Sequence, residues 1–154
     1  MSYSVRKDFK FCYGHQLDNA YTALCHETIH GHNGKVEVYL RAVDSVDPLD
    51  ETGMVLDFTK IKNILGDYFD SILDHSLIMP NTMEKEYLNC LKKYNKRLII
   101  VDFNPTCENL AKMIYDNLSE RLGRCTKEIK IFKIVLWESE SGSATYEGNI
   151  LINI

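Results

Sequence analysis

The chain has 154 residues, of which 45% are hydrophobic and 26% charged, a length and composition typical of one globular domain with its own core over residues 1–154. The formal net charge of −4 argues against a general nucleic-acid binder, because such proteins carry a basic face. No apolar run is long enough to cross a bilayer and no apolar signal segment stands at the N-terminus, so a cytoplasmic protein without a membrane partner is expected.

Two strands are expected in the first third of the chain. Residues 4–12 carry Val and Phe side chains and predict a strand. Residues 35–43 alternate between apolar and polar side chains, which is typical of a half-buried antiparallel strand. The segment between them, residues 17–27, is irregular, and the polar residues 45–53 predict a turn.

Helical periodicity marks residues 57–73, where apolar side chains recur at helical spacing and Asp57 is placed to cap the first turn. Residues 80–94 predict a loop with a short helix, and residues 98–103 a short buried strand. A second long helix follows, with Thr106 as its N-cap.

Two further strands are expected near the C-terminus. Residues 128–138 form the longest predicted strand, and residues 144–148 can pair with it after a turn. The strands are amphipathic in the antiparallel manner, and helices and strands come in mixed order. This pattern favours an α+β fold, with both helices on one face of an antiparallel sheet.

Three histidines suggest a metal site. His15 follows the first predicted strand, and His30 and His32 flank a glycine before the second. Residues i and i+2 of a strand share a face, so His30 and His32 can aim two imidazoles at one point, and His15 on a neighbouring strand can supply a third. Three imidazoles with an open fourth position form a catalytic zinc site. A solvated strand face explains an isolated His-x-His equally well.

The five cysteines are scattered and include no Cys-x-x-Cys pair: Cys12, Cys25, Cys90, Cys107 and Cys125. This distribution argues against a disulfide framework, and most of the thiols are interpreted as small buried hydrophobes. Among them, Cys25, five residues before His30, is interpreted as the thiol that lies beside the suspected chemistry.

Six short motifs occur in order along the chain. They are Phe-x-x-x-His at 11–15, His-Gly-His-Asn at 30–33, Gly-Met-Val-x-Asp-Phe at 53–58, Leu-Asp-His at 73–75, Pro-Thr-x-Glu-Asn at 105–109, and a strand that ends in Glu at 135–138. Because all six motifs occur in this order, the chain resembles the 6-pyruvoyl-tetrahydropterin synthase family over nearly its whole length. A departure is Gly34, where the family usually has Tyr.

The resemblance implies a T-fold, that is, an antiparallel four-stranded sheet with two helices packed on one face. It also implies subunits that join edge to edge into barrels, as a homohexamer made from two trimers, which would cover exposed sheet edges. The active sites would lie at subunit interfaces and bind a pterin. Zinc would be held by His15, His30 and His32.

Further roles are implied for residues that match the motifs. Asp74 and His75 would polarise a base and relay protons, although a histidine at the end of a helix can also simply interact with the helix dipole. Glu138 would accept two hydrogen bonds from the amino-pyrimidinone edge of the pterin. Thr106 and Glu108 would add a pterin contact, although Thr106 can be no more than a helix cap.

The catalytic base has two candidates. The usual synthase has a cysteine before His-Gly-His, a role that Cys25 could fill. One branch of the family, known from malaria parasites among others, has Glu-x-x-His-Gly-His instead, and Glu27 stands three residues before His30. On an extended segment, Cys25 and Glu27 would share a face. We therefore expect that both can reach the pocket.

The resemblance implies a zinc-dependent carbon–oxygen lyase that converts 7,8-dihydroneopterin triphosphate to 6-pyruvoyl-tetrahydropterin with loss of triphosphate. One alternative is side-chain cleavage to 6-hydroxymethyl-7,8-dihydropterin for folate synthesis, with Glu27 as base. Another is the related 6-carboxytetrahydropterin synthase. A T-fold binding protein without activity is a fourth possibility, against which the presence of Asp74, His75 and a base candidate argues.

Overall fold

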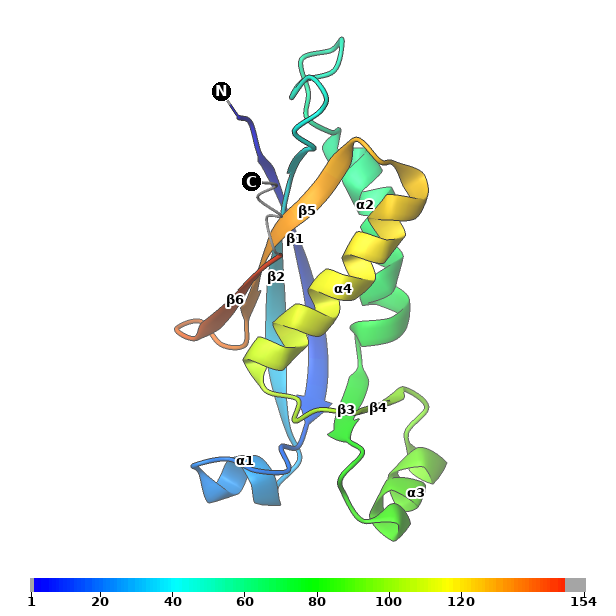
Figure 1. Cartoon of the computed structure of the whole chain (residues 1–154). Helices are drawn as coiled ribbons and strands as arrows, with labels where there is room; N and C mark the ends of the chain where they lie inside the picture. The colour runs from blue at the N-terminus through cyan, green and yellow to red at the C-terminus, as the bar shows by residue number, and fades with distance from the viewer. Residues whose placement is uncertain (1, 149–154) are drawn as a thin grey trace.

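A six-stranded mixed sheet forms the centre of the computed structural model, which describes residues 2–148 (Figure 1). The strand order is β4-β3-β1-β2-β5-β6. Helices α2 and α4 lie along one face of this sheet, whereas α1 and α3 both lie at one end of it, on opposite sides (Figure 1). The α+β class and the placement of the two long helices agree with the sequence-based prediction.

Four strands form an antiparallel ladder. β1 (Val5–His15) pairs with β2 (His30–Ala42) along its whole length, β2 pairs with β5 (Ile129–Trp137), and β5 pairs with β6 (Ser143–Glu147). Both β1 and β2 are longer than predicted. Their extensions carry the three histidines, which therefore lie within the ladder.

The other two strands correct the prediction of an antiparallel four-stranded sheet. β3 (Ser76–Pro80) pairs with β1 in parallel, and β4 (Leu98–Val101) pairs with β3 in parallel. All five residues of β3 are buried, so this strand has no polar face that would have produced an alternating pattern. Helix α3 (Lys85–Tyr94) connects β3 to β4, and a crossover of this kind produces a parallel pair.

The helices begin where the capping residues predict. Asp57 accepts hydrogen bonds from the backbone N–H groups of Thr59 and Lys60 at the start of α2 (Phe58–Asp67). A π-helical turn, η1 (Tyr68–Leu73), continues α2. The hydroxyl of Thr106 accepts from Asn109 N–H at the start of α4 (Cys107–Cys125). The segment expected to be irregular contains one short helix, α1 (Ala23–Glu27).

The core lies between the sheet and these two long helices. Val36, Val38 and Leu40 of β2 are completely buried, and the ring of Phe9 stacks on that of Phe69 at 4.5 Å. This packing makes the central strands a rigid support for whatever their ends carry. Within residues 2–148, every helix is too short or too polar to span a bilayer.

Candidate metal centre

The pairing of β1 with β2 brings three histidines together. His15 lies opposite His30, and Tyr13 lies opposite His32. The Nε2 atom of His15 is 3.0 Å from that of His30 and 3.2 Å from that of His32. The prediction that these imidazoles converge is therefore confirmed, and we call the three residues the histidine trio.

Hydrogen bonds on the far side of the rings fix which nitrogen carries the proton. His15 Nδ1 lies 2.8 Å from the carbonyl oxygen of Pro105, and His30 Nδ1 lies 3.1 Å from that of Thr28. A carbonyl oxygen only accepts, so each Nδ1 must donate, and in a neutral imidazole Nε2 then carries a lone pair. The Nε2 atoms of His15 and His30 thus face each other as two acceptors, an arrangement that a shared cation would satisfy.

The spacing of the trio suits zinc. A tetrahedral zinc ion with Zn–N bonds of about 2.05 Å holds its nitrogen ligands about 3.3 Å apart, close to the observed separations. His15 is only 2% exposed, and burial lowers its pKa, which favours the neutral form that a metal needs. The side chain of His32 is 20% exposed, so the centre stays open on one side.

Glu138, which follows β5, lies beside the trio. Its Oε1 is 3.5 Å from Nε2 of His32 and 3.7 Å from Nε2 of His15, and it accepts a 3.2 Å hydrogen bond from the hydroxyl of Tyr13. Burial, together with the charge of Glu138, raises the pKa of Tyr13, so the phenol keeps its proton and remains a donor. Within residues 2–148, the ligand atoms that lie close enough to share one ion come from the trio alone. Glu138 therefore stands next to the metal position.

Asp74 and His75 form a hydrogen-bonded pair at the end of η1. His75 Nδ1 lies 2.8 Å from one carboxylate oxygen of Asp74, and the other oxygen accepts from Cys12 N–H, also at 2.8 Å. The Cys12 hydrogen bond, aided by the one from His75, lowers the pKa of Asp74. His75 has a left-handed backbone (φ 61°), and its N–H donates to the carbonyl of Cys12. These bonds tie the Asp74–His75 pair to the middle of β1.

A cavity of about 490 Å³ connects this pair with the trio, because His75 lines it together with His30 and His32. Cys12 and Asn33 also line it, and their side chains contact each other at 3.2 Å. The side chain of His75 is 78% exposed, and within residues 2–148 no hydrogen bond joins it to the trio. Within one chain, the Asp74–His75 pair therefore lies at the edge of the metal site, and the site remains open to solvent on that side.

The two base candidates lie in the short helix α1, so the expectation of an extended segment is wrong here. Residues two apart on a helix do not share a face, and Cys25 and Glu27 therefore point in different directions. Cys25 is half-buried and Glu27 is exposed, and neither lines the cavity. The thiol that does line it is Cys12, which sequence reasoning missed although it lies three residues before His15.

The start of α4 is tied to the metal centre through its backbone. Thr106 acts as the helix cap, and Glu108 lies exposed in the first turn. The residue that reaches the trio is Pro105, whose carbonyl oxygen orients the ring of His15. No sequence pattern indicates this contact, because every residue carries a carbonyl group.

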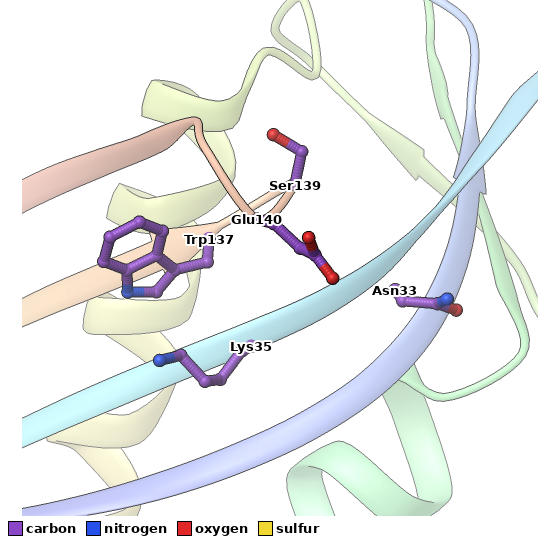
Figure 2. A pocket seen from close by; sticks show the side chains of 5 residues that line it. All are labelled: Asn33, Lys35, Trp137, Ser139 and Glu140. Atoms are coloured by element: carbon purple, nitrogen blue, oxygen red, sulfur yellow. The ribbon is translucent and has the colours of Figure 1, made fainter.

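A separate hollow of about 330 Å³ lies on the sheet face that α2 and α4 leave uncovered. Figure 2 shows the side chains that line it, which come from Asn33, Lys35, Trp137, Ser139 and Glu140. The ammonium of Lys35 lies 5.0 Å from the centre of the Trp137 ring and donates to the buried carboxylate of Glu37. Because successive residues of a strand face opposite ways, Lys35 points away from the side that carries His30 and His32. This hollow therefore lies apart from the histidine trio, although Asn33 lines both the hollow and the cavity beside the trio.

Known proteins are similar to this chain in sequence and in fold. The family model for 6-pyruvoyl tetrahydropterin synthase matches residues 4–149. A 6-carboxy-5,6,7,8-tetrahydropterin synthase from Aquifex aeolicus is 38% identical over 124 residues, which are 77% of this chain and 74% of that protein. One of the same name from Haemophilus influenzae is 28% identical and covers 94% of this chain and 99% of its own length.

Among solved structures, a 6-pyruvoyltetrahydropterin synthase from Plasmodium vivax, in which a catalytic glutamate is replaced by alanine, has a TM-score of 0.71. It is 20% identical to this chain and covers 97% of this chain and 99% of its own. The match of the family model to nearly the whole sequence, together with this fold, shows that the chain belongs to the 6-pyruvoyl tetrahydropterin synthase family.

Proposed function

We propose that this chain is a zinc-dependent enzyme that acts on the C6 side chain of 7,8-dihydroneopterin triphosphate. The observation that carries the proposal is the histidine trio, in which the tautomers of His15 and His30 direct their Nε2 lone pairs toward a common point. Zinc bound there would polarise the side-chain hydroxyls and acidify the adjacent C–H bond. The protein must then bind the ring and transfer the proton.

Proton transfer falls to the Asp74–His75 pair. The carboxylate of Asp74, held by Cys12 N–H and by His75 Nδ1, keeps the imidazole in the tautomer whose Nε2 can accept a proton. His75 is then free to take a proton from a base or from the substrate, because its side chain is largely exposed. The fixed backbone of His75 supports this role, since it keeps the ring at the mouth of the cavity.

Ring binding falls to Glu138. A carboxylate matches the amino-pyrimidinone edge of a pterin with two acceptors in one plane. In the present conformation Oε1 is 3.5 Å from His32 Nε2, which leaves no space for a bicyclic ring between the carboxylate and the metal position. Glu138 must therefore turn outward when pterin binds and exchange the hydrogen bond of Tyr13 for those of the ligand.

For the product, the relatives favour 6-carboxy-5,6,7,8-tetrahydropterin, because the similar proteins from Aquifex and Haemophilus carry the name of that synthase. This shifts the expectation away from 6-pyruvoyl-tetrahydropterin, the product that the motifs first suggested. Of these two pterins, the carboxy product keeps one side-chain carbon and the pyruvoyl product keeps three.

Side-chain cleavage to 6-hydroxymethyl-7,8-dihydropterin is the second candidate, and one specific feature favours it. Glu27 stands three residues before His30, as in the Glu-x-x-His-Gly-His branch, and the similar Plasmodium vivax enzyme also uses a catalytic glutamate. Helix α1 would have to bring Glu27 to the cavity, for example when substrate or a second subunit packs against it.

Mass analysis of the products from zinc-loaded enzyme and 7,8-dihydroneopterin triphosphate tests these assignments. We expect 6-carboxytetrahydropterin as the main product, with the hydroxymethyl product as the competing outcome. Unchanged substrate after prolonged incubation, with full zinc occupancy, would reject an enzymatic role and favour a T-fold binding protein.

We further propose that the chain forms a homo-oligomer, as a hexamer of two trimers, with the pterin pocket at a subunit boundary. The outer strands of the sheet, β4 and β6, each leave one edge without a partner strand among the described residues. The outward position of His75 also suits a site that a neighbouring subunit completes. A monodisperse monomer in light scattering at micromolar concentration would contradict this arrangement.

A further inference from the structure

A run of cations precedes β4 and takes no part in the chemistry described above. Residues 92–97 read Lys-Lys-Tyr-Asn-Lys-Arg, so four of six side chains are basic in a chain whose net charge is −4. An acidic protein repels anions in general, so a phosphorylated ligand needs a local concentration of positive charge. The structure shows where two of these cations point.

Lys96 and Arg97 line a cavity of about 290 Å³, together with His75, Leu77, Tyr94 and Asn95. Among the residues that the structure describes, no carboxylate lines this cavity. Within residues 2–148, no ion pair joins Lys96 or Arg97 to an acidic side chain. The carboxylate of Asp74 lies nearby, but its two oxygens already accept from Cys12 N–H and from His75.

Arg97 is held in place before any ligand arrives. Its Nη1 donates to the backbone carbonyl oxygens of Asp70 and Asp74, which fixes the guanidinium against the end of η1. The remaining N–H groups of Arg97 make no hydrogen bond within the described part of the chain. A fixed guanidinium with free donors binds phosphate oxygens at a small cost in side-chain entropy.

His75 connects this cavity to the metal centre, because it also lines the cavity that contains His30 and His32. A ligand that starts at the trio can therefore pass His75 and end between Lys96 and Arg97. We propose that the cavity lined by Lys96 and Arg97 binds the triphosphate group of the pterin substrate. This inference rests on the proposed function, since it assigns the phosphorylated end of that same substrate.

Calorimetric titration of the zinc-loaded 154-residue chain with inorganic tripolyphosphate at low ionic strength tests the binding step. Lys96→Gln removes one charge from an exposed position and should weaken binding about tenfold, the loss expected for one charge-assisted contact. Arg97→Gln should weaken binding at least as much. The matched control is Lys85→Gln at the other end of α3, about 13 Å along the helix and beyond the screening length at physiological salt. Lys85→Gln should bind tripolyphosphate with the affinity of the wild type.

Kinetics then test the link to the substrate. For 7,8-dihydroneopterin triphosphate, Lys96→Gln should raise KM about tenfold and leave kcat nearly unchanged, because the contact exists in the ground state and in the transition state alike. The affinity for unphosphorylated 7,8-dihydroneopterin should not change.

The outcomes separate this inference from the proposed reaction. Tripolyphosphate binding that weakens in Lys96→Gln, in a protein that does not turn over the pterin, would support the anion site and reject the reaction. The site would be overturned by wild-type protein that does not bind tripolyphosphate, or by equal affinities in the wild type, Lys96→Gln and Arg97→Gln.

Discussion

The metal centre and the helix α1 lie at the same end of the molecule but differ in how firmly their side chains are held. In the trio, the pairing of β1 with β2 sets the position of each ring, and carbonyl groups of Pro105 and Thr28 set the orientation of two of them. In α1, five residues long, no side chain is buried and the N-cap residue makes no side-chain hydrogen bond. One region is preorganised by the fold, and the other is not.

This difference indicates a division of roles. A metal ligand must be in place before substrate arrives, because displaced imidazoles lose affinity for the ion. A base needs its final position only in the complex with substrate. A marginal helix with an exposed Leu24, preceded by an exposed Tyr21, can reach that position when something packs against it. We therefore expect changes in the two regions to differ in kind. Changes in the trio should abolish metal binding, and changes in α1 should alter product formation only.

The largest effect is expected at the base candidates. We predict that Glu27→Ala lowers formation of 6-hydroxymethyl-dihydropterin by up to about 10⁴-fold, the upper range for a general base, and that Cys25→Ala does the same for 6-carboxytetrahydropterin, the expected main product. Both products are quantified by mass spectrometry, with the exposed Cys90→Ala as the control. Equal loss of both products in each variant would show that the two residues do not act as separate bases.

The next effect concerns the Asp74–His75 pair. Like the trio, the pair is held by hydrogen bonds, and like the side chains of α1, His75 is exposed. We expect His75→Ala to lower kcat about 10³-fold and to leave the zinc content unchanged. Mixing His75→Ala with His30→Ala subunits then shows which chain supplies the pair. If it serves a neighbouring subunit, random assembly should restore about a quarter of the sites. No recovery would place both groups in one chain.

A smaller effect is expected at Glu138. Its side chain is held less firmly than the trio and more firmly than the side chains of α1, because it accepts one hydrogen bond from Tyr13. Glu138→Gln keeps the shape but puts a donor against a ligand edge that also donates, and should weaken pterin binding by about 2–4 kcal/mol. Titration calorimetry with 7,8-dihydroneopterin measures this loss, and Glu140→Gln provides the control. Unchanged affinity in Glu138→Gln would exclude the pterin contact.

The smallest effect is expected for Tyr13→Phe, which removes only the hydroxyl that bonds to Glu138. Because Glu138 gives up this hydrogen bond when pterin binds, the same titration should show binding that is tighter by about 1 kcal/mol, the usual net contribution of one hydrogen bond. A loss as large as that of Glu138→Gln would mean that Tyr13 contacts the ligand itself.

The sequence predicted the parts of the fold that depend on short-range pattern. The alternation around Val36 and Val38, the caps Asp57 and Thr106, and the two-residue spacing of His30 and His32 each depend on neighbours in the chain, and each prediction is confirmed. Their physical basis is the geometry of single strands and helix ends.

What the sequence missed depends on partners far away along the chain. β3 pairs in parallel with β1, a choice set by the crossover and not by the five buried residues of β3 themselves. Cys12 enters the cavity because Asp74 and His75 bond to its backbone, and Pro105 reaches His15 through a carbonyl group that every residue has. Helix α1 was missed because five residues give too short a pattern.

Zinc content tests the central claim most directly. After exhaustive dialysis of the purified protein, metal analysis should find one zinc per chain in the wild type and in His26→Ala, which changes a histidine outside the trio. His30→Ala and His32→Ala should each lose most of this zinc, because two imidazoles hold the ion far more weakly than three. Undiminished zinc in both variants would contradict the assignment of the metal centre.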